Sequence, residues 1–134
     1  MTNDKIQMTN QSINPNSKYD IKERSLEFAA RTALFVRCIP KDIISSEYCK
    51  QLIRSSASIG ANTEEADGTL SKKDFVNKIA IARREARESR YWLNLIRKTN
   101  FIEGDILKME NEYLINESKE LLLILSSIIR KTKF

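Results

Sequence analysis

The sequence of 134 residues contains no histidine, and this absence excludes several classes of enzyme. Ser-His-Asp and Cys-His catalysis both need histidine, as do His-ligated zinc sites and the Glu-x-x-His di-iron sites of many helical bundles. Glycine occurs three times and proline twice, whereas 31% of the residues are charged. Because this mixture favours helices over turn-rich sheets, we expect an all-α protein.

Long apolar runs are also missing. No stretch approaches the roughly 18 apolar residues that a membrane-spanning helix needs, and the N-terminus lacks the apolar segment of a secretory signal peptide. We therefore expect a cytoplasmic protein without a membrane partner. The two cysteines, Cys38 and Cys49, do not have the spacing of a metal or redox pair. We expect them to be reduced and partly buried, with a disulfide or a reactive thiol as the alternative.

The N-terminal residues differ in composition from the rest of the chain. Residues 1–18 are rich in Asn, Gln and Ser and contain few apolar side chains. Such a segment buries too little surface to offset the entropy lost on ordering, so we predict a disordered tail over residues 1–18. Residues 19–134 suffice for one domain with a single hydrophobic core.

Four segments of this domain place apolar side chains at helical spacing, and local signals mark their ends. Asp20 and Glu23 are spaced as a capping box, and Pro40 disfavours helical backbone at the residue before it. Ser71 precedes Asp74 by three residues, as an N-cap would. The expected helices run from Asp20 to Ile39, from Ser45 or Ser46 to about Gly68, from Ser71 to just before Asn100, and from about Asp105 to Lys131. Because the connections are short, we expect antiparallel neighbours in an up-down-up-down four-helix bundle.

Two of these segments have unusual surfaces. Residues 55–61 (SSASIGA) are mostly small, which lets another helix approach closely. Gly60 costs about 1 kcal/mol of helix propensity relative to alanine, so we expect a packing reason for it. The C-terminal half of the fourth helix has more apolar surface than one core needs, which indicates a second buried surface such as a subunit contact. The apolar residues that lie off its core stripe are Leu122, Leu123 and Ile129.

The formal net charge of +5 is concentrated in one segment. Residues Thr69 to Asn100 include nine Lys or Arg residues against three acids, while the charges of the other segments nearly cancel. On a helical wheel these basic residues occupy one broad side, with Arg83, Arg87 and Arg90 at i, i+4 and i+7. A one-sided basic helix on an otherwise nearly neutral protein indicates an anionic partner, and we favour nucleic acid.

The side chains on this side of the helix suit phosphate binding. Guanidinium groups form paired hydrogen bonds with phosphate oxygens, and a tyrosine among them can stack on an unpaired base. The candidate nucleic-acid-binding residues are Lys73, Arg83, Arg84, Arg87, Arg90, Tyr91 and Lys98. The alternative is a solvated helix face on which Arg84 pairs with Glu88, and on which Tyr91 is a surface-packing or interface residue.

Paired carboxylates are the other chemical feature of the sequence. Glu117 falls within the apolar stripe of the fourth helix, close to Glu110, and a buried acid needs a partner. One interpretation is a carboxylate metal site or a general acid. The other is a structural pairing with a neighbouring helix, through Arg54 or Arg97 or with Asn62. We favour the structural pairing because histidine ligands are missing and no nucleophile or cofactor loop accompanies the acids. We therefore expect no enzymatic activity, no cofactor and no metal.

Several long segments resemble a known family. The chain resembles, from Tyr19 to Arg130, the small bacterial four-helix-bundle proteins named for an open reading frame in intervening sequences of 23S ribosomal RNA genes. The segments that carry this resemblance are QLIRSS at 51–56, IGAN at 59–62, EA at 65–66, SKKDF at 71–75, ARREARESRYWL at 82–93, ESKELL at 117–122 and ILSSII at 124–129. The family is also similar to the accessory variability protein of diversity-generating retroelements, a basic ring that works with nucleic acid and a reverse transcriptase.

The resemblance implies an up-down bundle that assembles as a homopentamer. The small residues of the second helix and the apolar excess of the fourth would then form subunit contacts. The resemblance supplies no catalytic residues, and it adds a reverse transcriptase or another protein as a candidate partner.

Two hypotheses for function follow from the sequence. The first is a non-enzymatic oligomeric nucleic-acid-binding protein, with RNA preferred, that uses the basic face of its third helix. The alternative is an interaction scaffold that binds an acidic protein partner and no nucleic acid. A carboxylate metalloenzyme is a third and less favoured hypothesis.

Overall fold

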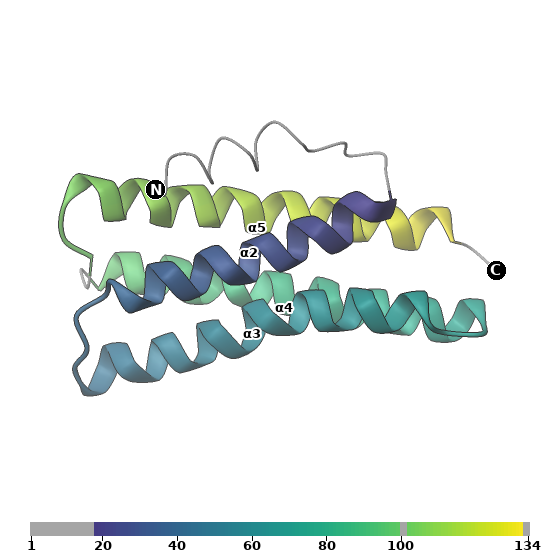
Figure 1. Ribbon diagram of the computed structural model, residues 1–134, viewed down its shortest axis with the longest axis horizontal. Helices are drawn as coiled ribbons and strands as arrows, with labels where there is room; N and C mark the ends of the chain where they lie inside the picture. The colour runs from purple at the N-terminus through teal and green to yellow at the C-terminus, as the bar shows by residue number, and fades with distance from the viewer. Residues whose placement is uncertain (1–17, 100–101, 133–134) are drawn as a thin grey trace.

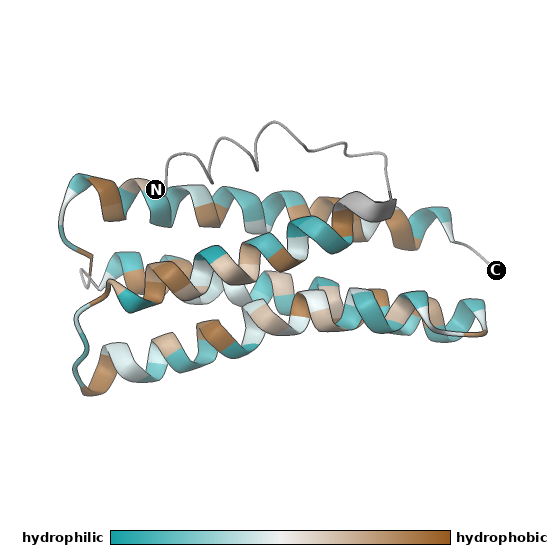
Figure 2. Cartoon of the chain, viewed as in Figure 1, coloured by the Kyte–Doolittle hydropathy of each residue, from teal (hydrophilic) through white to brown (hydrophobic). Residues whose placement is uncertain are grey.

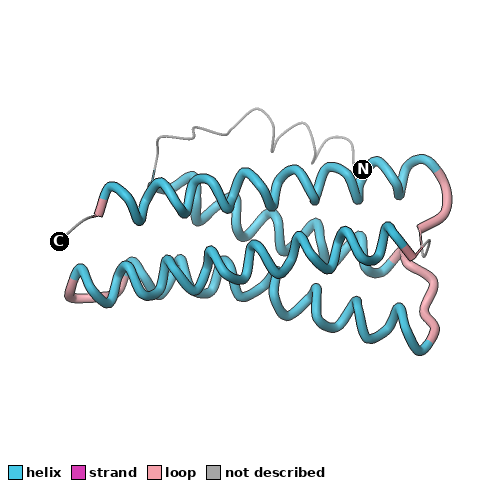
Figure 3. Tube along the Cα trace, turned by 180° about the vertical axis from the view of Figure 1, so that it is seen from behind, coloured by secondary structure: helices cyan, strands magenta, loops and turns pink. Residues whose placement is uncertain are grey.

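The computed structural model describes residues 18–99 and 102–132, which form an elongated bundle of antiparallel helices (Figure 1). The helices are α2 (Lys18–Arg37), α3 (Ile43–Asp67), α4 (Lys72–Lys98) and α5 (Asp105–Lys131). The α2–α3 and α4–α5 connections lie at one end of the bundle, and the α3–α4 turn lies at the other (Figures 1 and 3). This arrangement confirms the all-α, up-down-up-down four-helix bundle expected from the sequence. The tail predicted over residues 1–18 lies outside the described residues, except for Lys18, which begins α2.

The core is built from the apolar stripes of all four helices. Figure 2 shows that apolar residues recur along each helix between polar ones. Trp92 is partly buried against this core. The largest fully buried apolar side chains are Phe28, Phe35, Leu52, Ile59, Leu93, Ile96, Leu114, Leu121 and Leu125. Over the described residues, none of the helices has both the length and the apolar character that crossing a membrane requires.

Helix ends were predicted with uneven success. The Ser71 hydroxyl accepts a hydrogen bond from the Asp74 N–H at 3.1 Å, so the predicted N-cap of α4 is confirmed. The prediction that Asp20 caps the first helix is wrong, because helical backbone already begins at Lys18. Asp20 therefore lies within the first turn of α2 rather than at its N-cap.

The start of α3 is also corrected, because Asp42 rather than Ser45 or Ser46 is its N-cap. The Asp42 carboxylate accepts hydrogen bonds from the N–H groups of Ser45 and Ile44 at 2.8 and 2.9 Å. The Ser45 hydroxyl accepts one in return from the Asp42 N–H at 2.9 Å. The hydrogen bond from the Ser45 N–H is the main cause of a lowered pKa of Asp42. Ser45 is thus the reciprocal residue of a capping box.

The small residues of α3 pack within the chain. A Cβ atom built on Gly60 would lie 3.5 Å from the Ser25 Cβ, so α2 approaches α3 closely at this point. On the other side of α3, the buried Ser89 hydroxyl of α4 donates a hydrogen bond to the buried Ser55 hydroxyl at 2.8 Å. The expected packing reason for Gly60 is confirmed. Of the small residues proposed as subunit contacts, only Ala57 and Ala61 are left exposed.

Replacing Gly60 by alanine should stabilise the protein. The added methyl group would be in ordinary van der Waals contact with Ser25, and alanine restricts the unfolded chain and favours the helix. We expect the free energy of unfolding, measured by urea denaturation, to rise by about 0.5–1 kcal/mol. Gly60→Leu is the matched control and should lower it, because a larger side chain must displace α2. A loss of stability in Gly60→Ala would show that the α2–α3 contact admits no methyl group.

Two ion pairs join α2 to α5, and they replace the partners predicted for the buried acids. Arg24 donates through Nε and Nη2 to both carboxylate oxygens of Glu117, at 2.9 and 2.8 Å. Arg31 binds Glu110 in the same way at 3.0 and 2.7 Å. The structural interpretation of Glu117 is confirmed, but its partner is neither Arg54 nor Arg97 nor Asn62. The Asn62 amide instead donates to the Ser58 carbonyl oxygen in its own helix.

The spacing of these pairs fixes the register between α2 and α5. Arg31 lies seven residues after Arg24 on α2, and Glu110 lies seven residues before Glu117 on α5, as expected for antiparallel helices. The register therefore places Lys18 opposite Leu123, and the last two turns of α5 extend beyond α2 (Figure 1). Leu123 is 63% exposed, and Ile128 and Ile129 are only partly buried. Of the apolar residues predicted to lie off the core stripe, Leu123 is left exposed, whereas Leu122 and Ile129 are partly buried.

Candidate nucleic-acid interface

All seven candidate residues lie on α4, along its full length. Lys73 is in its first turn and Lys98 is its last residue, so at 1.5 Å per residue the row is roughly 37 Å long. Arg84, Arg87 and Tyr91 are exposed, as are both of these lysines, whereas Arg83 and Arg90 are partly buried. We call the six cations Lys73, Arg83, Arg84, Arg87, Arg90 and Lys98 the basic face.

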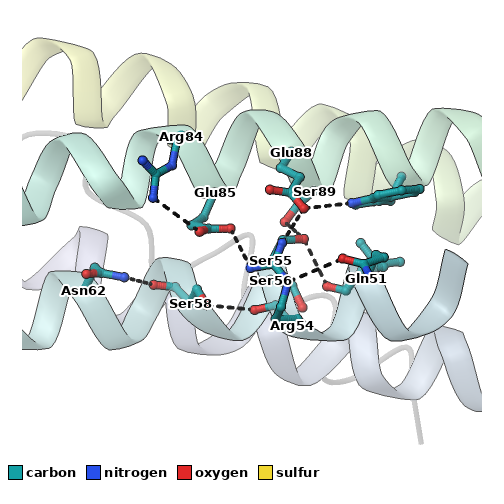
Figure 4. Close-up of polar contacts among 12 residues, drawn as sticks. Gln51, Arg54, Ser55, Ser56, Ser58, Asn62, Arg84, Glu85, Glu88 and Ser89 are labelled. Carbon is teal, nitrogen blue, oxygen red and sulfur yellow. Dashed lines mark hydrogen bonds and ion pairs between the residues drawn. The ribbon is translucent and has the colours of Figure 1, made fainter. Parts of the chain in front are cut away.

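Two of the three acids of α4, Glu85 and Glu88, are bound by α3, and the third, Asp74, lies in the first turn of the helix. Arg54 of α3 forms an ion pair with Glu88 and lies 3.4 Å from Glu85 (Figure 4). Glu85 has a buried side chain, only 9% exposed. The alternative pairing of Arg84 with Glu88 is therefore wrong: Glu88 is bound by Arg54, and Arg84 is left 4.0 Å from Glu85. The other cations of the basic face form no ion pair within the described part of the chain.

Glu88 is the best-bound of these acids. Trp92 Nε1 donates a hydrogen bond to its carboxylate at 3.1 Å, in addition to the contact with Arg54. Partial burial disfavours the charged form of Glu88, but the hydrogen bonds from Trp92 and Arg54 outweigh it and lower its pKa. Glu88 is therefore ionised at neutral pH. Its carboxylate is bound by Arg54 of α3 and by Trp92, while the nearby charge of Arg84 also lowers its pKa.

The flank of α4 that faces α5 carries additional positive charge. Arg97 of α4 forms an ion pair with Glu112 of α5 at 2.9 Å, which sets the antiparallel register of the two helices. Arg90 lies seven residues before Arg97, and Lys119 lies seven residues after Glu112. The register therefore places Arg90 opposite Lys119, and both residues are basic. Lys119 is exposed and has no ion-pair partner among the described residues. We add it to the candidate surface.

Sequence reasoning missed Lys119 because the fourth helix has almost no net charge. Its acids and bases are separated by side: Glu110 and Glu117 face α2, where they are paired, while Lys119 lies toward α4. The sequence contains a signal for Lys119. Arg83, Arg90 and Arg97 are spaced by seven residues on α4, and Glu112 and Lys119 are spaced by seven on α5. This signal becomes readable only after the register between the helices is known.

The other chemically active residues do not form a site. Cys38 is exposed rather than partly buried, Cys49 is buried as expected, and both are free thiols. Burial raises the pKa of the Cys49 thiol, which keeps it protonated and unreactive at neutral pH. Within residues 18–99 and 102–132, no cluster of three or more Cys, Asp or Glu side chains is arranged to hold a metal ion.

Comparisons with known proteins agree with this architecture. The family described as 23S rRNA-intervening sequence protein matches residues 17–127. A crystal structure of a protein of unknown function from the S23 ribosomal protein family of Bacteroides thetaiotaomicron is 36% identical in sequence. The match covers 84% of this chain and 97% of that one, with a TM-score of 0.71. No curated protein matches the chain.

The family match spans more than half of the sequence and includes all of α3 and α4. The solved relative is similar over nearly its whole length, so the likeness concerns the complete bundle rather than one helix pair. Its own function is unknown, and it brings no assigned site to the basic face. The chain belongs to the 23S rRNA-intervening sequence protein family.

Proposed function

We propose that this protein is a non-enzymatic, oligomeric nucleic-acid-binding protein that prefers RNA and contacts phosphates through the basic face of α4. The observation that carries the proposal is that Arg54 of α3 binds the carboxylates of Glu85 and Glu88. Three arginines at i, i+4 and i+7 are left without an acid partner in the described structure, beside an additional cation at Lys119. Arg87 is exposed and Arg83 and Arg90 are partly buried, and guanidinium groups in such a row can form paired hydrogen bonds with phosphate oxygens.

The kind of binding follows from the kind of side chain. Phosphate contacts give affinity that depends strongly on salt and weakly on sequence. We therefore expect broad recognition of the nucleic-acid backbone rather than readout of a base sequence. The family description names an intervening sequence of 23S rRNA, which supports RNA as the first ligand to test.

Self-association is the second part of the proposal. Leu123 of α5 is exposed, and Ile128 and Ile129, in the last two turns of α5 beyond α2, are only partly buried, which supports an apolar subunit contact. The resemblance described from the sequence implies a homopentamer, and we propose that assembly for this chain. Repetition of one basic face around a ring would raise the apparent affinity for a long nucleic acid well above that of a single subunit.

The salt dependence of binding tests the proposal. A labelled RNA hairpin and a DNA duplex of equal length are titrated with protein between 50 and 200 mM salt, and light scattering gives the particle mass. About four phosphate contacts per site predict a slope of log affinity against log salt near −3.6. Absence of binding at 50 mM salt would contradict the proposal and favour an acidic protein as the partner. A particle with the mass of one chain would contradict the oligomeric part alone.

A further inference from the structure

Tyr91 is an exposed aromatic residue in the middle of the basic face. Its side chain is 58% exposed, which is unusual for a residue of this size on a bundle helix. Arg84 and Arg87 precede it by seven and four residues, and Lys98 follows it by seven, so all three lie on the same side of α4. The ring is therefore a large, mostly open apolar surface within a row of cations.

The ring of Tyr91 is also held in place. It packs edge to face against Trp92, with ring centroids 5.0 Å apart and an interplanar angle of 77°. Trp92 is itself fixed by its hydrogen bond to Glu88 and by the ring of Tyr48, whose centroid lies 5.9 Å away. Glu88 is in turn bound by Arg54 of α3 (Figure 4). A side chain ordered in advance loses little conformational entropy when a ligand binds.

The surroundings of Tyr91 define the ligand that fits it. The cations bind phosphates, and the open part of the ring offers a stacking surface for a base. Bases inside a duplex are covered by their neighbours, so only an unpaired base presents a face to a protein ring. We propose that Tyr91 is a stacking platform that makes the basic face select unpaired nucleotides over base-paired ones. This inference rests on the proposed nucleic-acid binding and adds the class of nucleic acid.

Trp92 provides a direct readout because it is the single tryptophan of the chain and contacts Tyr91. A single-stranded 12-nucleotide RNA and a 12-base-pair RNA duplex serve as probes, with affinity measured by anisotropy. We expect the single strand to change the Trp92 emission and the duplex to leave it nearly unchanged. Tyr91→Ala should weaken single-strand binding roughly 5- to 100-fold and leave duplex binding within about twofold. Tyr91→Phe should retain single-strand binding, because stacking requires the ring and not the hydroxyl.

The outcomes separate this inference from the proposed function. Equal losses on both probes, or no loss on either, would overturn the role of Tyr91 in selection while RNA binding itself stands. A change in particle mass in Tyr91→Ala would overturn it as well, because Tyr91 would then be a subunit contact. Failure of the wild-type protein to bind either RNA would overturn the proposed function, and this inference with it.

Discussion

Replacing Glu117 by alanine should lower the free energy of unfolding by about 3–5 kcal/mol. The two oxygens of Glu117 accept hydrogen bonds from Nε and Nη2 of Arg24, and each side chain is at most 8% exposed. Removing the acid leaves a buried guanidinium without its bidentate acceptor. Breaking a buried pair from one side is costly because the charge that stays behind has been taken out of water.

The measurement is urea denaturation at pH 7, at fixed protein concentration because self-association affects stability. The double variant Arg24→Met with Glu117→Leu should recover most of the loss, since apolar side chains of similar volume replace both charges. Glu120→Ala is the matched control: it removes an exposed acid from the same helix and should change stability by less than about 0.5 kcal/mol. A loss below about 1 kcal/mol in Glu117→Ala would show that the α2–α5 pairs contribute little.

Reversing the charges of Arg83, Arg87 and Arg90 together, by replacing each with glutamate, should weaken RNA binding on the order of 100-fold or more at low salt. Three favourable phosphate contacts are lost, and three repelling charges take their place. The loss should be similar for different RNA sequences, because backbone contacts carry no sequence information. Circular dichroism checks that the bundle is intact, since Arg83 and Arg90 are partly buried.

Two variants control for this result. Replacing Arg37, Lys50 and Lys131 by glutamate gives the same change in net charge at exposed positions outside α4, and it should reduce affinity far less. Replacing Arg83, Arg87 and Arg90 by lysine keeps the charge and should retain most of the binding, although lysine cannot form bidentate hydrogen bonds. Equal losses in the two glutamate variants would show that net charge rather than the basic face governs binding.

The sequence was sufficient for the architecture because local signals determine it. Helical periodicity, Pro40 and the cap at Ser71 define the number of helices, and the start of α5 at Asp105 agrees with the prediction. The cap at Asp42 was missed because two isoleucines follow it. Ile43 and Ile44 are both exposed and lie outside the apolar stripe that was taken to begin the helix.

Ion-pair partners were not predictable from one helix at a time, because they depend on which faces the fold brings together. Glu117 was recognised as an acid that needs a partner, but Arg24 was not recognised as that partner, nor Arg31 as the partner of Glu110. Both arginines flank the buried Phe28 on the first helix at a spacing of seven. Glu110 and Glu117 have the same spacing of seven on the last helix. Two arginines and two glutamates with equal spacing on antiparallel helices indicate a pair of ion pairs, and the sequence does contain this signal.

The candidate interface was likewise predictable only in part. Periodicity placed the basic residues on one side of α4, but whether the acids of α4 pair with them depends on contacts with α3. Arg54 is more than thirty residues before Glu85 and Glu88 in sequence and binds both of these acids, which leaves Arg84 only a 4.0 Å contact with Glu85. The contribution of Lys119 likewise depended on the α4–α5 register set by Arg97 and Glu112.

The most direct test of the account is the salt dependence of RNA affinity, measured side by side for the wild-type protein and the variant with glutamate at positions 83, 87 and 90. If these arginines contact phosphates, the wild-type slope is steep and the variant slope is shallower by roughly 2–3. Equal slopes in the two proteins would contradict the account, because phosphate contacts would then be made elsewhere on the molecule.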